Sequence, residues 1–177
     1  MKKTAIILIL ILVFLIIYFL QANFFTWFTI ANIKPNLFIV FILFISLYSN
    51  NKVGISFGIL SGLFLDIVIG NNIGSKAIML AIIAIIGAYF DKNFSKESKI
   101  TILLMVIGAT LIYETGLYIL QIINLSINIE IGQFIYITLI ETIYNIILTI
   151  ILYPLIQKFG YKIENTFKEP KILTRYF

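Results

Sequence analysis

Three carboxylic acids, Asp66, Glu114 and Glu141, interrupt otherwise apolar stretches of this 177-residue chain. Two carboxyl groups can divide general acid and general base roles when their surroundings set their protonation states apart. The chain contains no His and no Cys, which excludes imidazole bases, thiol nucleophiles and the usual transition-metal ligands. One Asp and two Glu on separate segments match no hydrolase, nucleotide-binding or zinc-protease motif. We therefore expect no enzymatic activity, no cofactor and no metal.

Glycines lead up to the first of these acids at a fixed spacing. Gly54, Gly58, Gly62 and Asp66 recur every four residues, which places them along one stripe of an α-helix. Such a stripe forms a groove without side chains, in which another membrane helix can approach backbone to backbone. A carboxylate inside a membrane helix is costly and is a functional candidate by default. We interpret the stripe as a helix-packing or partner-binding surface, and the packed helix is either internal or belongs to another protein.

The composition defines the class of protein. Hydrophobic residues make up 61% of the chain and charged residues 12%, and the mean hydropathy is +1.07. Soluble domains carry about 25% charged residues, so this chain lacks the polar surface that a water-soluble globule needs. We expect an all-α polytopic membrane protein with no nucleic-acid partner.

Six apolar segments would position the acids: residues 4–20, 35–48, 53–69, 77–90, 100–123 and 134–156. No small-residue cleavage site follows the first segment, so we interpret it as a retained span rather than a signal peptide. The second and fourth segments are short for a full crossing of about 20 residues. Pro154 falls in the last turn of the sixth segment, where a kink or an end is expected. We predict one transmembrane domain over residues 1–157 and a basic, interfacial cytoplasmic tail over residues 158–177.

Three residues beside the stripe are further candidates for helix packing or partner binding: Pro35, Gly70 and Gly74. Pro35 opens the second segment, and proline suits the first turn of a helix because its missing N–H costs nothing there. Gly70 and Gly74 bracket a short polar turn after the stripe.

The basic residues indicate how the chain crosses the membrane. With both termini in the cytoplasm, every Lys and Arg except Lys34 and Lys76 lies on the cytoplasmic side, as the positive-inside rule requires. This orientation needs an even number of crossings. We therefore expect a multi-pass protein of the bacterial plasma (inner) membrane, in contact with membrane lipid.

Position along the segments places the three acids at a similar depth. With a rise of about 1.5 Å per residue, Asp66 and Glu114 lie about 20 and 21 Å from the cytoplasmic start of their segments, and Glu141 about 10 Å from the outer start of its own. The hydrocarbon core is about 30 Å thick, so all three fall in its outer third. We expect an outer polar cluster that also contains three other residues: Asn145, Lys34 and Lys76. The alternative is that each acid simply reaches interfacial water.

The second to fourth segments resemble those of a known family, MreD. The residues that carry the resemblance are Pro35-Asn36-Leu37, then Gly58, Gly62-Leu63, Asp66, Gly70 and Gly74, and finally Ala88-Tyr89. MreD is the small polytopic subunit of the bacterial rod-shape machinery, the elongasome. The length, the six-segment layout and the lack of a soluble domain are also similar over essentially the whole chain.

The resemblance implies partners and a fold. MreD-like proteins bind MreC, a bitopic protein with a large extracytoplasmic part. Together they help couple cytoplasmic MreB filaments to the peptidoglycan synthase RodA and its partner transpeptidase. The implied fold is similar to the substrate-binding subunits of energy-coupling-factor (ECF) vitamin transporters, which hold a ligand near the outer face.

A true ECF substrate-binding subunit is the alternative function. Such subunits dock their coupling protein through an alanine-rich pattern on an early helix, whereas residues 4–20 contain one Ala and no stripe of small residues. This difference favours the scaffold over the transporter. An aromatic cluster at residues 24–28 is either a membrane-interface anchor or a second contact for the partner.

Overall fold

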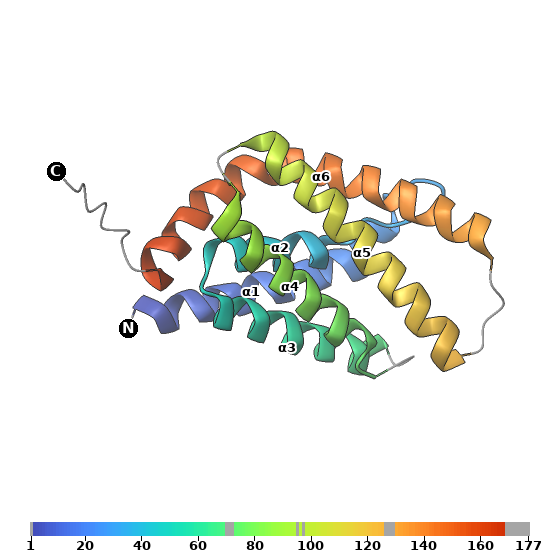
Figure 1. Cartoon of the computed structure of the whole chain (residues 1–177), viewed down its shortest axis with the longest axis horizontal. Helices are drawn as coiled ribbons and strands as arrows, with labels where there is room; N and C mark the ends of the chain where they lie inside the picture. Colours follow the sequence, from blue (N-terminus) through green and yellow to red (C-terminus); the bar gives the residue numbers. More distant parts are fainter. Residues whose placement is uncertain (1, 70–72, 95, 97, 126–129, 169–177) are drawn as a thin grey trace.

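The computed structural model describes residues 2–69, 73–94, 96, 98–125 and 130–168. In these ranges the elements follow the order α1 (Lys2–Ala22), η1 (Phe24–Thr26), α2 (Leu37–Tyr48), α3 (Asn51–Ile69), α4 (Ser75–Asn93), α5 (Lys99–Leu125) and α6 (Ile131–Phe167). Successive α-helices run in opposite directions along the long axis, so α1 begins at the same end of the molecule at which α6 ends (Figure 1). The all-α polytopic fold predicted from the sequence is confirmed.

The helices differ in how far they could reach across a membrane. Four described stretches are long and apolar enough to cross, by length and composition: Lys3–Thr26, Asn51–Ile69, Lys99–Ile123 and Ile131–Phe167. α4 has 19 residues and α2 has 12, which at about 1.5 Å per residue gives about 28 and 18 Å. α4 is therefore longer than the segment 77–90 expected from the sequence, whereas α2 is short, as predicted.

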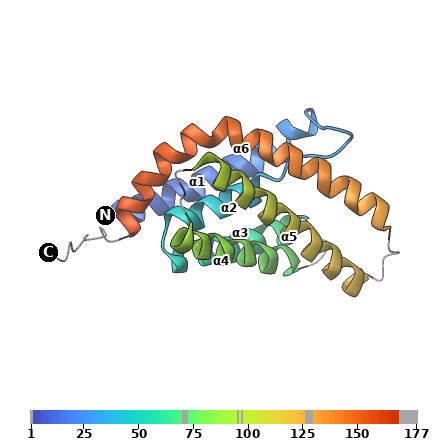
Figure 2. The same ribbon diagram turned by 45° about the horizontal axis from the view of Figure 1, so that its top comes forward.

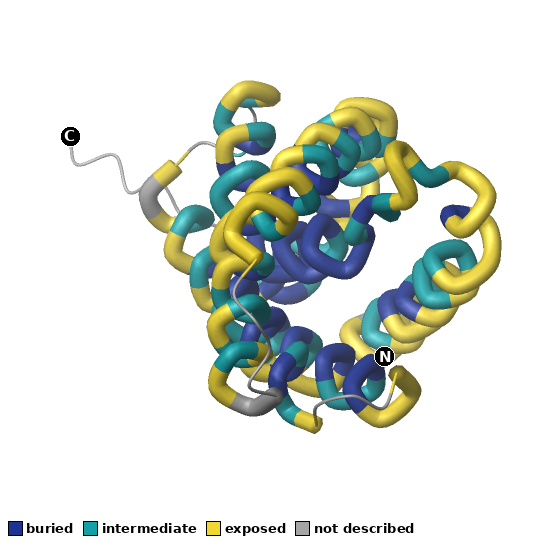
Figure 3. Tube along the Cα trace, turned by 90° about the vertical axis from the view of Figure 1, so that its right-hand side faces the viewer, coloured by how far each residue is buried: buried dark blue, intermediate teal, exposed yellow. Residues whose placement is uncertain are grey.

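α2 forms the centre of the molecule because it is apolar on every side. A helix of that composition is stable where other helices enclose it, and every residue of α2 except Phe41 is buried. Its neighbours include α3, α4, α5 and α6, and Figure 3 shows the buried residues gathered between the helices. α1 is also apolar on every side, but among residues 3–22, whose burial is described, only Leu10 and Phe14 are buried. Its outward side chains suit contact with lipid, which is as apolar as they are.

The start of α2 differs from the sequence prediction. Pro35 does not lie in the first turn of the helix, because α2 begins at Leu37 with Asn36 as its N-cap. The chain first makes a tight turn between Ile30 and Ile33, whose backbone groups bond each other at 3.1 and 2.9 Å. Pro35 is buried, and its carbonyl accepts a hydrogen bond from the side chain of Gln21 on α1. Pro35 thus ends the extended approach to α2 rather than opening the helix.

α6 is longer than the sequence suggested. It has 37 residues and continues through Pro154 to Phe167, so of the two expected alternatives, a kink or an end, the end at Pro154 is wrong. The boundary predicted at residues 157–158 lies within the helix. Gly160 and Phe167 are buried whereas Lys158 and Lys162 are exposed, which makes the last part of α6 amphipathic. Residues 169–177 of the expected tail lie outside the described residues.

Candidate functional site

The glycine stripe of α3 packs directly against the backbone of α4. A Cβ atom added at Gly58 would lie 2.6 Å from the carbonyl oxygen of Leu80, and one at Gly62 would lie 2.3 Å from the Cα of Ala77. No side chain fits at such distances, so glycine is what allows the two helices to approach. The packed helix is therefore internal to this chain, which resolves the alternative that the sequence left open.

Two further glycines let α2 reach the same hairpin. A Cβ atom at Gly54 on α3 would lie 2.7 Å from Ser46 Oγ, and one at Gly87 on α4 would lie 2.9 Å from Ser46 Cβ. The Ser46 hydroxyl donates a hydrogen bond to the carbonyl oxygen of Ala84. Gly87 was not predicted from the sequence, although α4 carries a visible signal in the repeated alanines at positions 77, 81, 84 and 88.

Asp66 caps the N-terminus of α4 from the neighbouring helix. Its Oδ2 accepts hydrogen bonds from the N–H groups of Gly74 at 2.9 Å and Ala77 at 3.1 Å, and its Oδ1 accepts one from the N–H of Lys76 at 3.2 Å. The first N–H groups of a helix have no partner within the helix, and a negative charge there is favourable. Asp66 is fully buried, and the Lys76 ammonium lies 3.7 Å from Oδ1. This acid thus has a structural role in the α3–α4 hairpin.

The glycines after the stripe explain why the cap comes from another helix. Gly74 is the N-cap of α4 and has a φ of 100°, a left-handed conformation that glycine adopts without strain. Glycine has no side chain with which to cap the helix, so Asp66 supplies the acceptor. Gly70 lies outside the described residues.

A second polar site holds the N-terminus of α2 inside the helical bundle. The Asn36 N–H donates to Asn145 Oδ1 at 2.8 Å, and the Asn145 amide donates to Thr110 Oγ1 at 3.1 Å. The side-chain oxygen of Gln21 accepts the N–H of Leu37 at 3.4 Å. Asn145 and Thr110 are fully buried, so side chains of α1, α5 and α6 replace the water that would otherwise solvate this helix end.

Glu114 on α5 and Glu141 on α6 meet next to this site. Their carboxyl groups interact directly, and the side chain of Asn36 lies within reach of Glu141. A hydrogen bond between two carboxyl groups requires a proton on one of them. Glu141 is 8% exposed, and its Oε1 atom has no hydrogen-bond partner within the described part of the chain.

The single outer cluster expected from the sequence is therefore two sites. Asp66 pairs with Lys76 at the start of α4, whereas Glu114 and Glu141 lie with Asn145 between α5 and α6. The acids of both sites, Asp66, Glu114 and Glu141, nevertheless interact electrostatically with the buried Tyr113 hydroxyl. Lys34 is partly exposed and joins neither site, since it makes no ion pair among the described residues. A similar expected depth did not imply contact, because Asp66 lies within the α3–α4 hairpin whereas Glu114 and Glu141 lie on α5 and α6.

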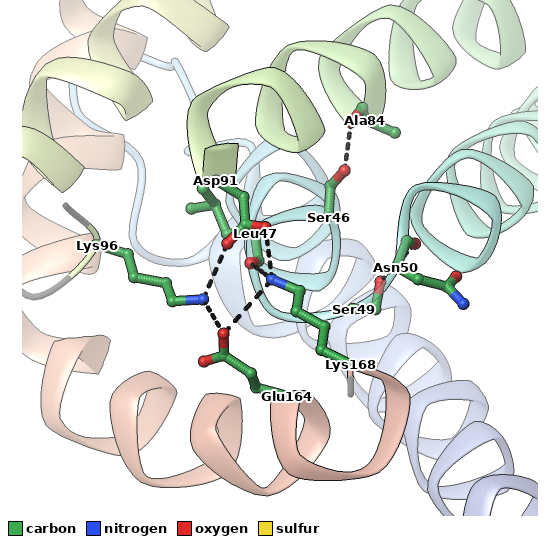
Figure 4. A network of polar contacts seen from close by, with 9 residues as sticks. All are labelled: Ser46, Leu47, Ser49, Asn50, Ala84, Asp91, Lys96, Glu164 and Lys168. Carbon is green, nitrogen blue, oxygen red and sulfur yellow. Dashed lines mark hydrogen bonds and ion pairs between the residues drawn. The ribbon is translucent and has the colours of Figure 1, made fainter. Parts of the chain in front are cut away.

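A third polar site, which the sequence analysis missed, closes the opposite end of the molecule (Figure 4). The Lys96 ammonium lies 2.9 Å from Asp91 Oδ1 and also bonds Glu164. The Lys168 ammonium lies 2.7 Å from Asp91 Oδ2 and donates to the carbonyl oxygen of Leu47 at 2.8 Å. We call Asp91, Lys96, Glu164 and Lys168 the ion-pair latch. The latch joins the ends of α2, α4 and α6. In the sequence, only the spacing of four residues between Glu164 and Lys168 indicated an ion pair at this end.

The latch also sets the charge of its own members. Burial alone would raise the pKa of the Asp91 carboxyl, but hydrogen bonds from Lys168 and Lys96 outweigh it and hold that pKa below its ordinary value of 3.8. Burial alone would lower the pKa of Lys96, but Glu164 and Asp91 hold it above 10.5. Both groups are therefore charged over the whole neutral range of pH.

These three sites define the class of the protein. Its buried polar groups bind helix ends and one another, and the described residues contain no group of three or more His, Cys, Asp or Glu side chains that could hold a metal. It is a helical membrane protein whose polar residues chiefly hold its own helices together. The family model of the rod shape-determining protein MreD matches residues 1–163 of the 177 residues, so the chain belongs to the MreD family.

No curated protein and no solved structure gives a significant match to this chain. The family is a shape-determining one, and the resemblance stated from the sequence is confirmed. The similarity to ECF substrate-binding subunits stays a prediction.

Proposed function

We propose that this chain is the non-catalytic membrane subunit that binds MreC and helps couple MreB filaments to RodA and its partner transpeptidase. The observation that supports the proposal is the family match over residues 1–163, which covers α1 to α5 and most of α6. In this proposal the protein is a multi-pass protein of the bacterial inner membrane with both termini in the cytoplasm. The basic residues and the shared position of the start of α1 and the end of α6 support that topology (Figure 1).

The packing of α3 limits the surfaces of this chain to which MreC could bind. Because α4 and α2 already fill the glycine stripe, the stripe leaves no groove for a helix of another protein. The aromatic residues 24–28 remain available: Trp27 is 88% exposed and Phe28 is 54% exposed. The segment is nevertheless held in place, because the Tyr144 hydroxyl on α6 donates to the carbonyl oxygen of Phe28. We propose this segment as part of the MreC contact on the extracytoplasmic side.

An affinity purification of the tagged chain from native membranes in mild detergent tests the proposal. Mass spectrometry should recover MreC together with the cell-wall synthases. Recovery of an ATPase pair with a coupling subunit instead would contradict the proposal and favour an ECF transporter.

The same purification can test the contact itself. Replacement of Trp27 with alanine should reduce the recovered MreC at equal expression. Ile73 is 82% exposed on the α3–α4 connection at the same end of the molecule and provides the matched control, Ile73→Ala. Equal recovery of MreC with both variants would exclude residue 27 from the contact.

A further inference from the structure

A cleft opens between α5 and α6 near the segment that joins them. Its volume is about 420 Å³, within the range of about 300 to 1,000 Å³ in which proteins bind small ligands. The two helices diverge toward this end of the molecule, as two views show (Figures 1 and 2). The cleft and the ion-pair latch lie at opposite ends of the molecule. In the proposed topology, the end with the cleft is the outer side.

The walls of the cleft carry two carboxyl groups and no described ammonium or guanidinium group. Glu114 and Glu130 line it, together with the amides of Gln121 and Gln133, and its lining includes no Lys or Arg. Lys76 is already paired with Asp66. A cationic ligand would therefore meet no competing ammonium group among the described lining residues.

Glu141 adds a buried acceptor behind this wall. Its carboxyl group contacts that of Glu114, and its Oε1 atom has no hydrogen-bond partner in the described ranges although the residue is 8% exposed. A buried polar atom without a partner is costly. Glu141 does not line the cleft itself, but a positive charge placed beside Glu114 would favour the ionised form of this carboxyl pair.

An aromatic surface completes the cleft. The rings of Tyr118 and Phe134 stack with centroids 4.4 Å apart and planes 17° apart, and both residues line the cleft. Aromatic faces attract ammonium groups. The Tyr118 hydroxyl is buried and has no hydrogen-bond partner within the described residues.

We propose that this cleft binds the ammonium group of a small organic amine. Glu114 and Glu130 supply carboxylate oxygens that accept its N–H groups, Glu141 lies behind Glu114, and the aromatic rings of Tyr118 and Phe134 face the ammonium group. Binding of an amine in this cleft does not require MreC, so it can be tested on the purified chain alone.

The test uses diaminobutane as the probe and the full chain in nanodiscs of uncharged lipid. Calorimetry should detect saturable binding of diaminobutane and none of butanediol, which has the same chain length without charge. Glu114→Gln, which keeps size and hydrogen-bonding groups, should weaken binding about tenfold or more, because one lost charge-assisted contact has a free energy of about 1.5–3 kcal/mol. Glu164→Gln removes an equal charge in the ion-pair latch and should leave the affinity unchanged.

A second measurement avoids substitutions. A hydrophobic carbodiimide should label Glu114 of the unmodified chain, and diaminobutane should protect it, as mass spectrometry of the labelled peptides would show. Absence of saturable binding, equal binding of butanediol, or equal affinity in Glu114→Gln would each overturn the proposal. Weaker binding in Glu164→Gln to the same extent as in Glu114→Gln would also overturn it, since binding would then depend on net charge alone.

Discussion

Replacing Gly62 with alanine should force α3 away from α4. The added Cβ would lie 2.3 Å from the Cα of Ala77 and 2.7 Å from the carbonyl oxygen of Lys76. Optimal contact between carbon atoms lies at about 3.5 Å or more, so the helices must separate by about 1.2 Å. Both neighbouring atoms belong to the backbone and cannot rotate away.

That separation would also break the cap of α4. Asp66 lies one turn beyond Gly62, and its hydrogen bonds to α4 are 2.9 to 3.2 Å long. A shift of about 1 Å takes such bonds beyond the normal range. Overpacking costs about 1–3 kcal/mol and the net loss of one hydrogen bond to a charged group costs about 1.5–3 kcal/mol, while the higher helix propensity of alanine returns about 1 kcal/mol. We therefore expect Gly62→Ala to lower the free energy of unfolding by about 3 kcal/mol.

Circular dichroism during unfolding in mixed micelles of dodecyl maltoside and dodecyl sulfate would measure this loss. Gly108→Ala on α5 is the control, because a Cβ atom there meets nothing within 4 Å and alanine favours a helix by about 1 kcal/mol over glycine. If Gly62→Ala unfolds at the same detergent fraction as the wild type, the packing argument is refuted. Gly62→Leu should be more severe, with loss of the folded protein.

Three other predictions concern the cap of α4, the ion-pair latch and the packing of Gly160 on Tyr48. Asp66→Ala should lower the melting temperature more than Asp66→Asn, because Asn keeps one acceptor for the N–H groups of α4; equal loss would show that charge, not hydrogen bonding, matters. Since the pKa of Asp91 is held below 3.8, its ion pairs stabilise the fold above that pH and are lost as the pH falls through the lowered pKa. The difference in melting temperature between wild type and Asp91→Asn should thus be constant from pH 7 to about pH 5 and should shrink below about pH 4. A difference that stays constant down to about pH 2.5 would contradict the assignment of these ion pairs to Asp91. Gly160→Ala should destabilise the end of α6, since its Cβ would lie 2.7 Å from the ring of the buried Tyr48, and hydrogen exchange should increase there; unchanged exchange would show that the ring can move aside.

Much of the fold could be predicted from the sequence because lipid simplifies the problem. A membrane helix satisfies its own backbone, so long apolar segments indicate helices directly. The ends of helices were less predictable. Pro35 suited a first turn by its type, but Asn145 holds the chain one residue later and α2 begins at Leu37. Pro154 did not end α6, because the ion-pair latch and the packing of Gly160 on Tyr48 stabilise the helix beyond it.

The candidate site was predictable in its residue types but not in its pairings. The spacing of Gly58, Gly62 and Asp66 indicated a close helix contact, and the structure shows which helix makes it. No spacing rule could reveal that Asp66 caps α4, because the cap depends on the left-handed backbone at Gly74. The ion-pair latch joins residues far apart in the chain, and single charges such as Asp91 are common near the ends of membrane helices.

Cell shape under depletion of this chain tests the central claim most directly. The gene would be placed under a repressible promoter in the source bacterium, and cell length and width would be measured as the protein is lost. If the chain is a shape-determining subunit, rod cells should widen and become round as it is depleted. The wild-type chain supplied from a plasmid should restore the rod shape. Rods that keep their width after the chain is no longer detectable would contradict the account.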